Sequence, residues 1–231
     1  MKEAGIREAR QNLSALIAEV RKGHEVTITD RGKAVARLVP PRPADAKPFR
    51  GRAAFRRRMP QLNKPLSSAI LDAEPSEAEA TGPASPGIEA AVYIDASALA
   101  KLYVPEAESE RLDAFLRGRL GLMISELAIT EVLSAVARRK REGELRPELA
   151  NEIRGALLAD ADSGSFARLH LDPAVHRDAE RLLLATDSLP LRTLDALHIA
   201  LAFSGRATHV LTFDRRMREA AVQAGMNVID V

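Results

Sequence analysis

Four acidic residues in the second half of the chain stand where carboxylates can do chemistry. Asp95 and Asp214 each end a short apolar run, whereas Glu131 and Asp195 lie near the starts of amphipathic segments, among apolar neighbours. Carboxylates drawn together in a partly buried pocket repel one another, so some must protonate or a cation must neutralise them. A divalent metal ion is the usual solution. The spacing therefore predicts a metal-binding acidic site.

The chemistry of the available donors narrows the choice of metal. The chain has no cysteine, and no pair of histidines has ligand spacing. Hard oxygen ligands favour Mg²⁺ or Mn²⁺ over zinc, and such an ion orients water and stabilises charge on a phosphodiester. Taken singly, each acid is more often a helix cap or a solvated group than a ligand. We expect Ser97, Thr212 and His198 to contact these acids without binding the metal ion themselves.

The elements that must position these acids alternate along the chain. Short apolar runs predict strands at 92–94, 122–125, 166–171, 210–213 and 228–229, with helical patterns between them. Two of the helices are expected at Glu126–Arg141, capped by Ser125, and at Leu194–Phe203. This alternation predicts an α/β fold with a mostly parallel sheet covered by helices on both faces. Ligands bind at the carboxyl edge of such sheets, where Asp95 lies.

Composition and charge limit the class of protein. Of 231 residues, 46% are hydrophobic and 29% charged, which is ordinary for a globular protein. No signal peptide or membrane-crossing run is visible, so a cytoplasmic protein without membrane contact is expected. Residues 1–71 carry 16 Lys and Arg against 6 Asp and Glu, whereas the remainder carries 18 against 26. This asymmetry indicates either nucleic-acid binding by the first part or electrostatic docking between the two.

Residues 1–40 predict a small α/β unit. Apolar residues recur at helical spacing from Ile6 to Val20, with a possible break near Asn12, and Gly23 follows as a helix stop. The alternating runs 26–29 and 35–39, joined by a turn at 30–33, predict a β-hairpin. One helix and one hairpin bury too little surface to be stable alone, so we expect this unit to dimerise.

The pattern stops between residues 41 and 71. Five prolines interrupt this segment, and sparse apolar residues lie among many arginines. Such a segment cannot build its own core and is expected to be extended, or ordered only against a partner. Residues 72–90 are rich in Ala, Pro, Ser, Glu and Gly, which predicts a flexible linker and a domain boundary. Natural fusion and engineered joining both remain open.

Residues 1–40 resemble the Phd/YefM antitoxins through the segments IREARQNLS (6–14), VTITDRGK (26–33) and ARLVP (36–40). The resemblance implies binding to operator DNA, with Arg10 and Arg31 as contacts, and an arm at 41–71 that wraps a toxin. We expect Phe49, Phe55 and Leu62 to fill apolar grooves and one arginine to enter the acidic pocket as a bidentate cation. The candidates are Arg50, Arg52, Arg56, Arg57 and Arg58, with the last three favoured. The alternative is a solvated basic run.

Residues 91–231 resemble the PIN-domain toxins of the VapC type through the segments VYIDASAL (92–99), TEV (130–132), LDALHIA (194–200) and LTFD (211–214). The resemblance implies a PIN-like α/β/α fold and a metal-dependent endoribonuclease that cleaves single-stranded or looped RNA. It also implies that Asp95, Glu131, Asp195 and Asp214 bind the Mg²⁺ or Mn²⁺ ion and carry the catalysis.

Together the two resemblances predict a toxin–antitoxin module on one chain, with RNA as substrate, operator DNA as partner and oligomers formed through both the N-terminal unit and the PIN domain. One alternative is a DNA-binding autorepressor whose PIN domain is a silenced co-repressor. Another is a PIN fold kept only as an oligomerisation scaffold, against which the intact acidic set argues. Whether the arm acts on its own toxin or on that of a neighbouring chain stays open.

Overall fold

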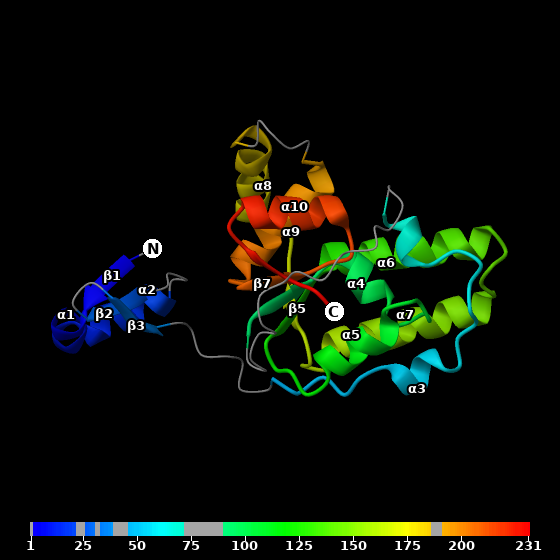
Figure 1. Ribbon diagram of the computed structural model, residues 1–231, viewed down its shortest axis with the longest axis horizontal. Coiled ribbons are helices and arrows are strands. Elements are labelled where there is room, and N and C mark those ends of the chain that lie inside the picture. The colour runs from blue at the N-terminus through cyan, green and yellow to red at the C-terminus, as the bar shows by residue number, and fades with distance from the viewer. Residues whose placement is uncertain (1, 22–25, 31–32, 39–45, 72–89, 186–190) are drawn as a thin grey trace. The chain divides into compact units, whose positions relative to one another are not determined.

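The chain divides into two compact units, residues 1–45 and 46–231. The computed structural model describes residues 2–21, 26–30, 33–38, 46–71, 90–185 and 191–231, and each unit is considered by itself (Figure 1). The predicted linker at 72–90 lies almost entirely outside the described residues. Within the described residues, no helix has the length and apolar character needed to cross a bilayer.

The first unit is a three-stranded sheet with two short helices. Its elements are β1 (Lys2–Gly5), α1 (Ile6–Gln11), α2 (Leu13–Arg21), β2 (Val26–Asp30) and β3 (Lys33–Leu38). The helix breaks at Asn12, as predicted, and the hairpin of β2 and β3 is antiparallel. Strand β1, which pairs in parallel with β2, was not predicted, because four residues without alternation carry no strand pattern. The small core of this unit contains Ala4, Ala9, Leu16 and Val26.

The second unit is built on a five-stranded sheet in which every pairing is parallel. Its strands are β4 (Val92–Ile94), β5 (Leu122–Ser125), β6 (Ala167–Leu169), β7 (His209–Leu211) and β8 (Asn227–Ile229), in the order β6-β5-β4-β7-β8. The chain starts in the middle at β4, proceeds to one edge and then returns to the other side. The strand order therefore reverses between β4 and β7, and ligands bind at such a point.

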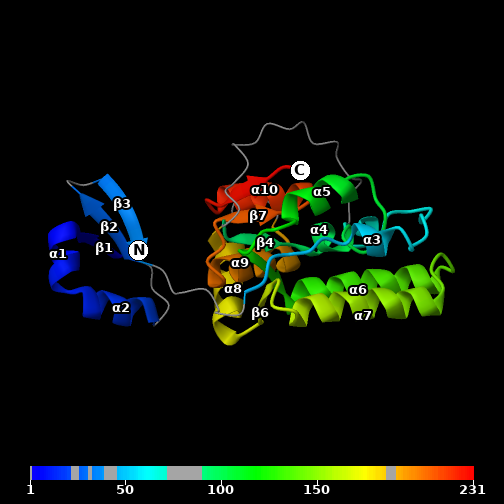
Figure 2. The same cartoon turned by 90° about the horizontal axis from the view of Figure 1, so that it is seen from below.

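Helices cover both faces of this sheet. They are α4 (Ala96–Ala100), α5 (Ser109–Leu116), α6 (Glu126–Arg141), α7 (Pro147–Asp162), α8 (Pro173–Ala185), α9 (Thr193–Ser204) and α10 (Arg215–Gln223). Val92 and Ile94 pack into a core with α4 to α7, whereas Tyr93 between them packs into a second core with α8, α9 and α10. This alternation along one strand makes the three-layer α/β/α arrangement. Figure 2 shows α6 and α7 side by side.

The segment 46–71, called the arm below, belongs to the second unit. We expected it to be extended, or ordered only against a partner. It contains two short helical turns, α3 (Ala53–Arg56) and the 3₁₀ turn η1 (Ser67–Ala69). Phe49, Met59, Leu62 and Leu66 are buried in the same core as the sheet. Figure 1 shows the arm following one side of the unit, past α5 and α7 to α4 and α6. In this structure the arm packs against the PIN-like unit of its own chain.

Candidate active site

Asp95 stands directly after β4 and begins α4 as its N-cap residue. Its side chain accepts a hydrogen bond from the backbone N–H of Ala98 at 2.9 Å. The hydroxyls of Ser97 and Thr212 donate to the same carboxylate at 2.8 and 2.6 Å. Thr212 follows β7, the parallel neighbour of β4, so the register brings it beside Asp95. The expected supporting contacts of Ser97 and Thr212 with Asp95 are therefore present.

Asp95 is buried, with only 4% of the residue exposed to solvent. Burial raises the pKa of Asp95 to about 6, although the nearby His198 and the hydrogen bonds from Thr212, Ala98 and Ser97 act in the opposite direction. Burial destabilises the charged form of a carboxylate, and a nearby cation stabilises that form. The site is thus prepared for a positive ligand.

Glu131 and His198 form a pair on the other wall of the site. The His198 Nε2 atom lies 2.6 Å from Glu131 Oε2, and its Nδ1 atom lies 2.6 Å from the hydroxyl of Tyr93, which also contacts Ser125 at 2.8 Å. Burial by itself lowers the pKa of His198, but the hydrogen bond and charge of Glu131, together with the charges of Asp95 and Asp195, raise it, and the pKa is raised overall. His198 thus holds Glu131 in place through a chain anchored on the sheet.

Asp195 and Asp214 each lie in a helix start. Asp195 is in the first turn of α9, where the backbone N–H of Arg192 hydrogen-bonds its carboxylate. Burial, followed by the charge of Asp214, raises the pKa of Asp195. Asp214 is the N-cap of α10 and accepts from the backbone N–H groups of Arg216 and Met217. Hydrogen bonds from the backbone at each helix start therefore fix both carboxylates.

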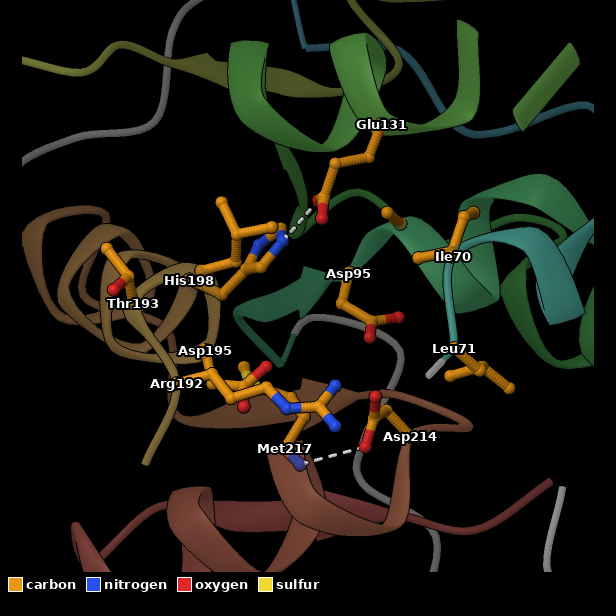
Figure 3. A pocket seen from close by; sticks show the side chains of 12 residues that line it. Ile70, Leu71, Asp95, Glu131, Arg192, Thr193, Asp195, His198, Asp214 and Met217 are labelled. Carbon is orange, nitrogen blue, oxygen red and sulfur yellow. Dashed lines mark hydrogen bonds and ion pairs between the residues drawn. The ribbon is translucent and has the colours of Figure 1, made fainter. Parts of the chain in front are cut away.

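All four predicted acids line one cavity of about 250 Å³, together with His198. Figure 3 shows the four carboxylates facing this cavity from separate elements. Sequence reasoning missed seven further lining residues, among them Ile70 and Leu71 at the end of the arm and Arg192 before α9. Arg192 lies one turn before Asp195 in the sequence, and this spacing could have placed it near the acids. Nothing in the local pattern around Ile70 indicated a contact with the acids.

The donor set fits a divalent cation. The Oδ2 atom of Asp195 is buried without a hydrogen-bond partner, and an oxygen in that state is completed by an ion or a donor. Carboxylate oxygens dominate the lining, which suits hard cations. In the described part of the chain, no three acidic or histidine side chains are close enough, as they stand, to share an ion.

The arginines of the arm bind other acids than those predicted. Arg56, 2% exposed, donates to Asp113 of α5 at 3.0 Å, and Arg52 pairs with Asp160 of α7. Among the described residues, the cavity lining contains no arginine of the arm. The expectation that one of them enters the acidic pocket is therefore not met. The physical reason is that buried carboxylates on α5 and α7 lie along the path of the arm, and a buried carboxylate without a cationic partner is costly in free energy.

The remaining predicted arm residues have separate positions. Phe49 packs against Phe166 with 5.3 Å between ring centroids, and Phe55 meets Tyr103 edge-on at 6.2 Å. Arg58 approaches Glu152 at 3.5 Å. The apolar grooves expected for Phe49, Phe55 and Leu62 exist, whereas Arg50 and Arg57 are exposed. In the first unit Arg10 is exposed on α1, and Arg31 lies outside the described residues.

Two family models match separate parts of the chain. The PIN domain model matches residues 92–223, and the model of the Phd/YefM antitoxin of type II toxin–antitoxin systems matches residues 1–72. Ribonuclease VapC46 of Mycobacterium tuberculosis is 37% identical over 61% of this chain and 97% of its own length. Antitoxin VapB35 of the same species is 42% identical over 17% of this chain and 44% of its own length.

Among solved structures, FitAcB from Neisseria gonorrhoeae is 19% identical, with a TM-score of 0.46 over 60% of this chain and 96% of that chain. The family models and the curated relatives agree with the α/β/α unit and its acidic cavity described above. The chain belongs to the PIN-domain family and carries, ahead of that domain, a Phd/YefM antitoxin segment, so that both partners of a toxin–antitoxin module are on one chain.

Proposed function

We propose that residues 91–231 are a metal-dependent endoribonuclease toxin that the arm keeps inactive in the resting chain. The observation that carries the proposal is the convergence of Asp95, Glu131, Asp195 and Asp214 on one cavity at the point where the strand order reverses. The 37% identity to Ribonuclease VapC46 supports RNA as the substrate class. A phosphodiester in this cavity would meet carboxylates from four separate elements.

The four carboxylates would hold Mg²⁺ or Mn²⁺, and the buried, unpaired Oδ2 of Asp195 supports this assignment. When bound, such an ion supplies positive charge at the phosphodiester and an acidified water at neutral pH. The residues of the chain do the positioning. Ser97 and Thr212 fix Asp95, and His198 fixes Glu131 against Tyr93. Such outer contacts orient ligands and tune their basicity.

The arm inhibits, in this proposal, by covering the cavity with apolar side chains. Two polar clamps secure its end: Ser67 bonds to Glu106 through its backbone N–H at 2.9 Å, and Arg139 donates to the Pro65 carbonyl at 2.7 Å. Just beyond these clamps, Ile70 and Leu71 line the cavity. Apolar side chains at the mouth exclude a charged RNA strand without having to compete for the metal ligands. We propose this mechanism in place of the earlier expectation that an arginine of the arm enters the acidic pocket.

The test uses the full chain with Ile70→Ala and Leu71→Ala, called the arm-opened chain below. We expect it to cleave single-stranded RNA with Mg²⁺ or Mn²⁺ at least tenfold faster than the parent chain, and to lose this activity in EDTA. The matched control is Leu184→Ala, which alters a leucine that is 84% exposed on α8 and absent from the cavity lining. It should stay as silent as the parent.

Two outcomes would contradict the proposal. Cleavage that persists in EDTA would exclude the metal assignment. An arm-opened chain that folds, binds the metal and still leaves RNA intact would favour the alternative of a transcriptional autorepressor with a silenced PIN domain.

The first unit is proposed to dimerise and bind operator DNA. Ile6, Leu13 and Ile17 are 49, 46 and 42% exposed, and apolar side chains on one pair of short helices suit contact with a second copy. Arg10, exposed in the last turn of α1, and Arg31 are the proposed DNA contacts. We expect the Arg10→Ala, Arg31→Ala double variant to lose binding to a fragment upstream of the gene in gel shifts. Unchanged binding would refute the assignment.

Oligomerisation through the PIN domain and a cytoplasmic location complete the proposal. Leu194 and Phe203 on α9 are 46 and 43% exposed, which supports a second contact between copies. A protein that acts on cellular RNA and on operator DNA meets both in the cytoplasm. Sedimentation of the full chain with and without Leu194→Ser and Phe203→Ser tests the contact, because a mass unchanged by both substitutions would place the interface elsewhere.

A further inference from the structure

Arg192 is a cation placed among the acids of the cavity. It is the residue before α9, and its backbone N–H is held by the carboxylate of Asp195. Among the described residues that line the cavity, it is the sole lysine or arginine. Figure 3 shows its side chain reaching into the cavity, with the guanidinium group pointing toward Asp214. Its backbone is thus fixed while its charged end faces the space where a substrate would enter.

The charges around the cavity indicate what Arg192 can bind. Asp95, Glu131, Asp195 and Asp214 place four carboxylates in the lining, and a single divalent cation would not offset all of them. An RNA phosphate that approaches this wall meets residual repulsion unless a further positive group faces it. A guanidinium fork matches two phosphate oxygens at once and keeps its charge at every physiological pH. Arg192 has both the position and the chemistry for this contact.

A role as a simple counter-ion is the competing interpretation. Burial and the charge of Asp214 raise the pKa of Asp195, and the charge of Arg192 acts in the opposite direction, so the two groups do interact. However, a group that only neutralised Asp195 could point along the helix start, whereas the side chain of Arg192 extends across the cavity (Figure 3). The residue is also only partly buried.

We propose that Arg192 is a further catalytic residue, which contacts the non-bridging oxygens of the RNA phosphate that is cleaved. The inference rests on the proposed ribonuclease function. In the hydrolysis, a P–O bond forms to the oxygen of water, the P–O bond to one ribose oxygen breaks, and the proton from water ends on that leaving oxygen. Arg192 exchanges no atom or electron in this step; it holds the phosphate and offsets the charge that builds up on its oxygens.

The experiment compares Arg192→Gln and Arg192→Lys in the arm-opened chain. The first measurement is binding of a fluorescein-labelled single-stranded RNA in EDTA, where no metal-dependent cleavage occurs, over a range of salt concentrations. Loss of one phosphate contact should weaken binding about tenfold. It should also reduce the slope of log K against log salt by about 0.7 in magnitude. Arg192→Lys should keep the slope, because it keeps the charge.

The second measurement is cleavage with Mg²⁺. We expect Arg192→Gln to lower kcat as well as to raise KM, and Arg192→Lys to restore KM more than kcat, because lysine lacks the fork. Arg181→Gln is the matched control: Arg181 is an exposed arginine of α8 that pairs with Asp178 and is absent from the cavity lining. Tyrosine fluorescence of each variant establishes that it is folded.

The outcomes separate this inference from the function on which it rests. A folded Arg192→Gln variant with the salt slope, RNA affinity and kcat of its parent would overturn the phosphate contact alone and leave a counter-ion to Asp195. If the arm-opened parent itself neither binds nor cleaves RNA, the ribonuclease proposal fails and the role of Arg192 falls with it.

Discussion

Replacing Arg56 by methionine tests how the arm is fastened to the PIN domain. The Arg56 guanidinium is 2% exposed and pairs with Asp113, whose side chain is fully buried. Removing one partner of a buried ion pair leaves the other charge uncompensated, at a cost of about 3–5 kcal/mol. Asp113 keeps hydrogen bonds from the backbone of Arg52 and from Arg117, so the lower end, about 3 kcal/mol, applies. The exposed contact with Glu110 adds little.

The assay is urea unfolding followed by tyrosine fluorescence. The chain has two tyrosines and no tryptophan, and both tyrosines are buried in the second unit, so the signal follows that unit alone. With an m-value of about 3 kcal/mol/M, a loss of about 3 kcal/mol lowers the midpoint by about 1 M. The control is Arg57→Met, at the exposed neighbouring position, which should change stability by less than about 0.5 kcal/mol.

Equal midpoints for Arg56→Met and the parent chain would refute this reasoning. A further check is the double variant Arg56→Met, Asp113→Leu, which removes both buried charges and should recover part of the loss. If the double variant is less stable than the single one by a full additional increment, the two residues act independently and the pair does not fasten the arm.

Three further predictions concern single positions. Gly51→Ala should destabilise the second unit by about 1–3 kcal/mol in the same urea assay, because Gly51 has φ +85° and a Cβ there would meet Asp113 at 2.7 Å; an unchanged midpoint would contradict this. Asp95→Asn in the arm-opened chain should abolish metal-dependent cleavage while asparagine still caps α4, so activity equal to the parent would remove Asp95 from the site. Ser125→Ala should cost about 0.5–2 kcal/mol through the lost cap of α6, and fluorescence melts that match the parent would count against it.

Much of the PIN unit was predictable because its signals are local. The apolar runs of β4 and β5 end at polar residues, and Ser125 marks the start of α6, so the observed bounds of these three elements match the predicted ones. The convergence of the acids also followed from a general rule, since the carboxyl ends of adjacent parallel strands meet at one edge. The pairing of Asp95 with Thr212 is a direct result of that register.

The docking of the arm was not predictable in the same way. Asp113 is fully buried but lies in the sequence among charged residues of α5, where it resembles a surface acid. Its partner Arg56 is 57 residues earlier in the chain, and no periodicity joins them. From charge alone, we predicted that an arginine of the arm would contact the acids of the active site, which the sequence had already identified. The contacts of Ile70 and Leu71 with the cavity depend on the whole path of the arm and carry no local pattern.

The arm shares one hydrophobic core with the PIN domain, and this has a consequence for how the cavity opens. Removal of the whole arm would expose the surface around Phe49 and Leu66 and break the buried pairs at Asp113 and Asp160. Loosening of the end at Ile70 and Leu71 disturbs none of these. Segments with few buried contacts open at a small fraction of the global unfolding free energy. In the proposed mechanism, release would therefore have two separate steps: a local opening of the end at Ile70 and Leu71, and a complete release that also breaks the buried pairs of the arm.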